Sequence, residues 1–183
     1  MGVDIHIRVT KYNEKTNLYE ELVLYMRGEE YHYDNEGNKV IDNPDFKRIP
    51  VYEGRNSEMF EGMLHGDEKD GYGDFPSFVI AFNSLEPKLR ADIEEKKKIA
   101  GYYDFYELTL ADMAFYLTKH GLVTDYNADW DDYETGKAPK PLKVNPIKYL
   151  FDDICKYIEF AEGGWSNYYN ELSRYKIIYY FDC

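Results

Sequence analysis

Alternating apolar and polar positions at the start of the chain predict a β-strand. In the opening segment MGVDIHIRV, apolar side chains stand at every second position from Val3 to Val9. A period of two over this length is typical of a strand with one buried face, and we expect it to end near Thr10. Asp4 and His6 then point to the same polar side of the strand, where they are either exposed to solvent or part of a metal or catalytic site.

The segments that follow are expected to form hairpins. YNEKTN (12–17) turns the chain into LYEELVLYM (18–26), the expected partner of the first strand. EEYHYDNEGNKVID (29–42) predicts a second hairpin, because DNEG supplies residues that tolerate positive φ at its tip. NPDFKRIP (43–50) contains two prolines and is expected to break regular structure.

Helical periodicity dominates the second half of the chain. EPKLRADIEEKKKIAG (86–101) and LTLADMAFYLTKHG (108–121) each predict a helix, the second with Thr109 as its cap and Asp112 at the capping-box position. The strongest pattern is NPIKYLFDDICKYIEFAEGG (145–164), which begins with Asn-Pro and ends at glycine. The apolar positions of this last helix are Ile147, Leu150, Phe151, Ile154, Cys155 and Ile158.

The order of the elements predicts the fold class. The terminal segment YKIIYYFDC (175–183) is aromatic and β-branched and predicts one more strand. Strands, then helices, then a returning strand suggest an α+β fold with an antiparallel sheet that includes both terminal strands, covered by three or more helices. The 183 residues fit a single domain over positions 1–183.

Charge narrows the possible partners. Asp and Glu number 35 against 22 Lys and Arg, which gives a formal charge of −13 and a pI near 4.7. Such a surface repels nucleic acid but attracts a basic protein surface, including a groove that normally holds nucleic acid. The 20 tyrosines fit this interpretation, because tyrosine is enriched in interface hot spots. The alternative is an ordinary acidic cytoplasmic protein.

Several classes of protein and site find no support in the sequence. No stretch approaches the ~18 apolar residues that a membrane span needs, and a secretory signal is not expected. Two cysteines suggest a reducing cytoplasm, with Cys155 in the core. Phosphate-binding glycine loops, GxSxG and HExxH are absent from the sequence, so no catalytic residue is predicted and an enzymatic role is not favoured.

Four short segments, spread over nearly the whole chain, resemble a family of phage and prophage proteins of unassigned function. They are MGVDIH at the start, RNSEMF (55–60), LTLADM (108–113) and RYKIIYYFD (174–182). Members of that family typically begin MGCDIH, carry RNYxLF and SWLTLxEL segments, and end in a strand with FDN. The fixed position of MGxDIH makes it the most specific of these matches.

The resemblance implies a set of site residues and some departures from the family. The residues carried over are Asp4, His6, Arg55, Asn56 and Asp182. The family's cysteine, tyrosine and final asparagine are replaced by Val3, Ser57 and Cys183, and the histidines that commonly precede SWLTL are missing from YYDFYEL, where Asp104 is the nearest carboxylate. If the terminal strands pair, Asp4, His6 and Asp182 form a three-ligand set for a divalent ion, with zinc the expected metal.

Two functional expectations follow from the resemblance and the charge. The first is a phage protein in the cytoplasm of a bacterial host that inhibits a defence complex, above all a type II CRISPR effector nuclease, and contains a structural metal. Some small phage inhibitors of those nucleases contain zinc. The second is a metal-dependent hydrolase of nucleotides or signalling molecules. In the first, acids of the loops at 65–74 and 125–134 steer the protein onto a basic surface, where aromatic side chains anchor it. The expected contacts of the second loop are Tyr126, Asp129, Trp130, Asp131, Asp132 and Tyr133.

Overall fold

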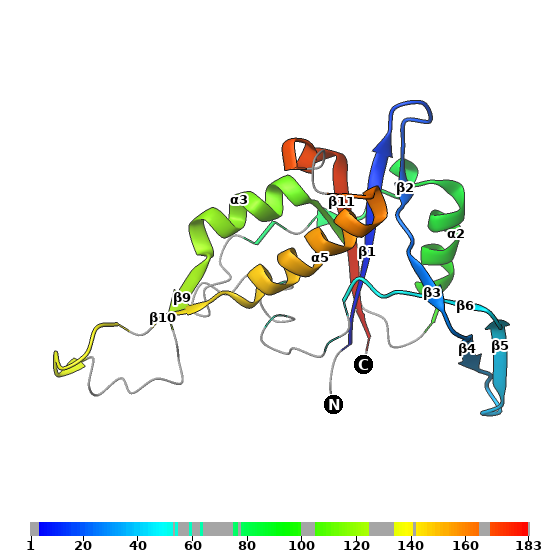
Figure 1. Ribbon diagram of the computed structural model, residues 1–183, viewed down its shortest axis with the longest axis horizontal. Helices are drawn as coiled ribbons and strands as arrows, with labels where there is room; N and C mark the ends of the chain where they lie inside the picture. The colour runs from blue at the N-terminus through cyan, green and yellow to red at the C-terminus, as the bar shows by residue number, and fades with distance from the viewer. Residues whose placement is uncertain are drawn as a thin grey trace.

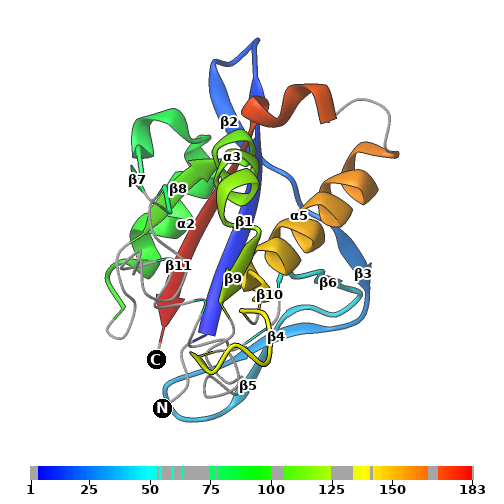
Figure 2. The same cartoon turned by 90° about the vertical axis from the view of Figure 1, so that its left-hand side faces the viewer.

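The computed structural model describes most of the chain (Figures 1 and 2). The residues described are 4–52, 54, 59, 63, 75–76, 78–99, 105–124, 134–140, 142–164 and 169–182. The strands are β1 (Asp4–Asn13), β2 (Leu18–Glu21), β3 (Tyr25–Arg27), β4 (Glu30–Tyr33), β5 (Lys39–Asn43), β6 (Phe46–Arg48), β7 (Phe78–Val79), β8 (Tyr106–Thr109), β9 (Leu122–Thr124), β10 (Leu142–Val144) and β11 (Tyr175–Asp182). The α-helices are α2 (Pro87–Lys96), α3 (Leu110–His120) and α5 (Pro146–Glu162), and the short 3₁₀ turns are η2 (Phe82–Ser84) and η3 (Tyr169–Arg174).

An antiparallel sheet brings the two ends of the chain together. Five strands of the described residues pair in the order β2-β1-β11-β8-β7. The first strand and the last run side by side, with Asp4 opposite Asp182 and Lys11 opposite Tyr175 (Figure 1). The α+β fold, with both terminal strands in the sheet and helices over it, is therefore as the sequence predicted.

Helices cover both faces of this sheet. Figure 2 shows α3 and α5 in front of the sheet and α2 behind it. The alternation of β11 matches these layers, because Ile177, Tyr179 and Phe181 belong to the core under α3 and α5, whereas Ile178 and Tyr180 belong to the core under α2. The central strand is thus buried on both faces, which explains its nearly continuous apolar sequence.

Local signals set the ends of the helices. The side chain of Asn145 accepts a hydrogen bond from the amide of Ile147 at 2.9 Å, Pro146 occupies the first turn of α5, and Gly163 ends the helix with φ of 75°. Thr109 and Asp112 form the expected capping box of α3. The six apolar positions predicted for α5 are all buried, Cys155 among them.

One helix and three strand boundaries differ from the prediction. The helix predicted over 86–101 ends at Lys96. The first strand continues to Asn13, beyond the predicted Thr10. The segment 18–26 is two strands, β2 and β3, which are separated at residues 22–24. The segment 43–50 contains β6, so its two prolines flank a strand that pairs with β3.

Residues 25–48 leave the main sheet and form an extension of two small ribbons, β3–β6 and β4–β5 (Figure 1). We call these residues the hairpin extension. Every residue of β3 is exposed, as are most of those in β4, β5 and β6. A two-stranded ribbon buries little apolar surface, and the contacts at its base therefore decide how it is held.

Candidate protein-binding site

The outer face of the β4–β5 hairpin carries three exposed apolar side chains. Tyr31 and Tyr33 lie two residues apart on one strand, and Ile41 stands opposite Tyr31 on the other. Their exposed fractions are 47%, 64% and 51%. The two tyrosine rings meet edge to face with centroids 5.7 Å apart, and the Lys39 ammonium lies 4.2 Å from the centre of the Tyr31 ring. We call these four residues the aromatic face.

The turn of this hairpin is fixed by its own sequence. The carboxylate of Asp34 accepts hydrogen bonds from the backbone amides of Asn38 at 2.8 Å and Glu36 at 2.9 Å, and Gly37 takes a φ of 83°. Hydrogen bonds from Asn38, and then those from Glu36 and Gly37, lower the pKa of Asp34 below its usual value. On the opposite side of the ribbon, a hydrogen bond of 2.9 Å joins His32 Nδ1 and Asp42. The aromatic face is therefore held on a locally ordered hairpin.

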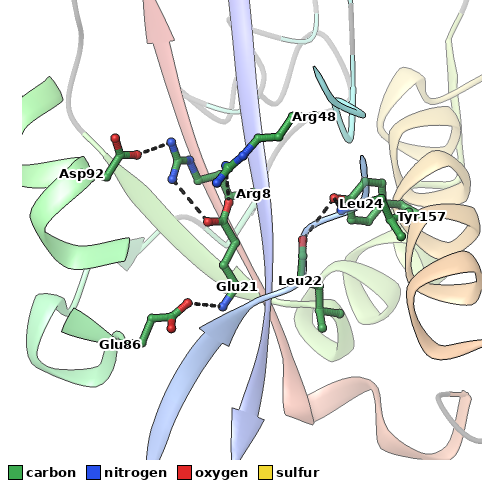
Figure 3. Close-up of polar contacts among 8 residues, drawn as sticks. All are labelled: Arg8, Glu21, Leu22, Leu24, Arg48, Glu86, Asp92 and Tyr157. Atoms are coloured by element: carbon green, nitrogen blue, oxygen red, sulfur yellow. Dashed lines mark hydrogen bonds and ion pairs between the residues drawn. The ribbon is translucent and has the colours of Figure 1, made fainter. Parts of the chain in front are cut away.

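Ion pairs connect the base of the extension to the main sheet (Figure 3). The carboxylate of Glu21, at the end of β2, accepts a hydrogen bond from Arg48 of β6 at 3.0 Å and lies 3.6 Å from the guanidinium of Arg8. Arg8 also pairs with Asp92 of α2. We call these four residues the ion-pair cluster. The side chains of Arg8 and Glu21 are only 12% and 11% exposed, so each charge needs its partner.

The electrostatics of Arg8 follow from this arrangement. Burial alone lowers the pKa of Arg8, but the negative charges of Glu21 and Asp92, together with Tyr180, raise it above its usual value. The guanidinium therefore stays charged over the whole physiological pH range. Glu21 is fixed a second time, because its backbone amide donates to the carboxylate of Glu86 at 2.8 Å.

A single tyrosine hydroxyl bridges the gap between β2 and β3. The hydroxyl of Tyr157, on α5, donates to the carbonyl of Leu22 at 3.1 Å and accepts from the amide of Leu24 at 2.9 Å (Figure 3). Those two backbone groups have left the pairing of β2, and the hydroxyl replaces a strand neighbour for them. Where the predicted strand 18–26 is interrupted, its backbone is therefore hydrogen-bonded to a side chain of α5.

A charged groove of about 540 Å³ lies between the extension and α2. Its lining combines the ion-pair cluster with Glu30 and Asp42 of the hairpin and two lysines of α2. Apart from Tyr25 and Leu89, the described residues that line it are charged. The charges of the ion-pair cluster offset one another, and the cluster joins the base of the hairpin extension to β1, β2 and α2.

The residues predicted to bind a metal lie at one end of the sheet. Asp4 and Asp182 are directly opposite in the pairing of β1 and β11, and His6 follows two residues along β1 on the same face. The ring of His6 stacks on that of Tyr180, with centroids 4.9 Å apart. Within the described residues, no group of three or more His, Cys, Asp or Glu is placed to hold a metal ion, but the side chain of Asp182 is outside that description. Metal binding stays a prediction.

The predicted partner contacts cannot be placed. They lie outside the described residues, and they are Arg55, Asn56, Tyr126, Asp129, Trp130, Asp131, Asp132 and Tyr133. The loop that carries the last six connects β9 to the segment before β10, two strands that pair with each other.

Sequence reasoning found the hairpin but missed its exposed aromatic face. The signal was present, since tyrosines at positions 31 and 33 with His32 between them must share one face of a strand. Their exposure was not readable, because it depends on what packs against the ribbon. Arg8 and Glu21 carried no such signal, as their partners come from distant elements.

No family model, curated protein or solved structure is significantly similar to this chain. Among the described residues, no helix combines the length and the apolar character needed to cross a bilayer.

Proposed function

We propose that this protein is a binding protein that inhibits a partner by docking the aromatic face of its hairpin extension onto a basic protein surface. The observation that carries the proposal is the exposure of Tyr31, Tyr33 and Ile41 on one side of a projecting ribbon. Exposed apolar groups that are gathered on one face of a soluble protein mark an interaction site. Tyrosines supply large contact areas at low entropic cost.

The chain's charge supports a basic partner. A formal charge of −13 steers the protein toward cationic surfaces and away from nucleic acid. The surface that a nuclease uses to hold nucleic acid is of this kind. Together with the resemblance to phage proteins, this supports a host defence complex as the target, with a type II CRISPR effector nuclease in the bacterial cytoplasm as the specific proposal.

The fixed base of the extension supports the same role. Glu21 and Tyr157 hold the start of the extension through ion pairs and hydrogen bonds from β1, β6 and α5. A binding element that is ordered before it meets its partner loses less entropy on association.

The test uses purified type II effector nucleases, with and without guide RNA. Binding and target cleavage are measured with the wild type and with Tyr33→Ala, and the matched control is Val79→Ala, which removes an apolar side chain that is 74% exposed on β7. We expect Tyr33→Ala to weaken binding about 30-fold, as for a hot-spot residue, and the control to bind like the wild type. Association should also slow as salt rises. Absence of binding at micromolar protein, or equal binding by both variants, contradicts the proposal.

We also propose that Asp4, His6 and Asp182 bind a divalent metal that ties the two ends of the chain together. The direct register of Asp4 and Asp182 supports it, and an imidazole with two carboxylates is a set that zinc accepts. Elemental analysis of the wild type and of His6→Ala is the test. We expect close to one equivalent in the wild type and a large loss in the variant. Less than about a tenth of an equivalent in the wild type would exclude the site.

An enzymatic alternative rests on the same three residues. A metal-dependent hydrolase needs an open coordination position for water. Metal-dependent turnover of nucleotides that Asp4→Ala abolishes would favour the hydrolase over the binding protein.

A further inference from the structure

A second hollow on the surface is apolar and lies apart from the aromatic face. It has a volume of about 430 Å³ and runs between α5 and the segment that follows β6. Leu24, Ile49 and Val51 form one wall, and Tyr157 and Phe160 of α5 form the other. Phe160 is 78% exposed beside this hollow.

The exposed side of α5 continues this groove. Tyr149, Asp153, Lys156 and Phe160 are spaced at i, i+4, i+7 and i+11 and therefore form one stripe along the helix. The two aromatic residues, 63% and 78% exposed, stand about 16 Å apart along the axis, with the charged pair between them. A short stretch of polypeptide is long enough to contact the whole stripe.

Two charged side chains, Asp153 and Lys156, also line the groove. Asp153 lines the groove and its side chain is 47% exposed. Its ion-pair partner Lys156 lies 3.7 Å away, beyond hydrogen-bonding distance. Burial first, and then the negative charge of Asp153, raise the pKa of Tyr52, the residue after Val51.

We propose that this groove binds a segment of a partner protein that inserts one large apolar side chain between Val51 and Phe160 and sets a lysine or arginine against Asp153. The apolar walls provide the burial, and the half-exposed carboxylate of Asp153, in a chain of charge −13, favours a cationic neighbour. The groove is a separate binding site, and it does not depend on the partner proposed for the aromatic face.

The test titrates the full chain with two blocked pentapeptides, Gly-Arg-Trp-Arg-Gly and Gly-Glu-Trp-Glu-Gly, and follows backbone amide signals by NMR. We expect the arginine peptide to shift the signals of Leu24, Ile49 and Val51 and to bind about fivefold more tightly than the glutamate peptide. Phe160→Ala should abolish these shifts, and Asp153→Asn should remove most of the difference between the peptides.

Phe115→Ala is the matched control, because it removes a phenylalanine that is 63% exposed on α3 and does not line the groove. It should bind both peptides like the wild type. Equal binding of the two peptides, no shifts at the groove, shifts confined to the aromatic face, or shifts that persist in Phe160→Ala would each overturn the proposal.

Discussion

Replacing Tyr157 by phenylalanine tests whether one hydroxyl holds the start of the hairpin extension. The substitution keeps the ring, which is 7% exposed in the core, and removes the oxygen that joins Leu22 and Leu24. It therefore leaves a backbone carbonyl and a backbone amide without their partner, while the packing of α5 is retained.

The magnitude follows from the two lost hydrogen bonds. Each bond contributes about 1 kcal/mol to stability, and because both are partly accessible to water the full penalty for a buried unsatisfied group does not apply. We expect Tyr157→Phe to lower the free energy of unfolding by about 2 kcal/mol. For a chain of this length, that corresponds to a fall of roughly 4–8 °C in Tm.

Two measurements check this expectation. Urea unfolding followed by circular dichroism gives the stability, and native-state hydrogen exchange of the Leu24 amide reports the local bond. Tyr149→Phe is the control, because it removes the hydroxyl of a 63% exposed tyrosine on the same helix. If Tyr157→Phe unfolds within about 0.5 kcal/mol of the wild type and the Leu24 amide exchanges at the same rate, the hydroxyl does not hold the extension.

Three further substitutions or conditions test the core. Ile154→Asp, at a position with no exposed surface, should unfold or aggregate the protein by burying an unpaired charge, whereas Tyr149→Asp should not; circular dichroism and gel filtration distinguish the two. Lys176→Met should lower the free energy of unfolding by about 3 kcal/mol, because Glu107 loses the ammonium that lies 2.8 Å from its carboxylate. Adding Glu107→Leu should recover much of that loss of stability in a double-mutant cycle. Burial raises the pKa of Tyr157 above 10.0, despite the opposing hydrogen bond from Leu24. The contribution of the protonated hydroxyl to the free energy of unfolding is therefore fully present below pH 10.0 and is lost as the pH rises through the raised pKa. Unfolding measured in alkaline buffers should show a steeper loss of stability in the wild type than in Tyr157→Phe.

Much of the fold was predictable because its signals are local. Asn145 and Pro146 set the start of α5 and Gly163 sets its end, and each of them acts within one helical turn. The two faces of β1 follow from its period of two, and the buried residues Ile5, Ile7 and Val9 are those that the pattern assigned to the core. Such features need no knowledge of the rest of the chain.

The rest depended on contacts between distant residues. The interruption after β2 is stabilised by a tyrosine that is 133 positions away from Leu24 in the sequence. No pattern within residues 18–26 predicts this interruption. The strand between the prolines of 43–50 exists because Tyr25–Arg27 pairs with it. The polar side of β1 is also not freely solvated, since Asp92 of α2 covers Arg8. The same limit applies to the candidate site. The sequence predicts that Tyr31 and Tyr33 share one face of a strand, but it does not predict that their side chains are exposed.

Hydroxyl-radical footprinting of the protein mixed with a type II effector nuclease shows whether the aromatic face forms the proposed interface. The method reports the accessibility of individual side chains, and Tyr31 and Tyr33 are exposed in the free protein. We expect oxidation of both tyrosines to fall at least about fivefold in the complex, because a hot spot excludes water, while Val79 on β7 reacts as before. Unchanged oxidation of Tyr31 and Tyr33 in a fully formed complex would contradict it.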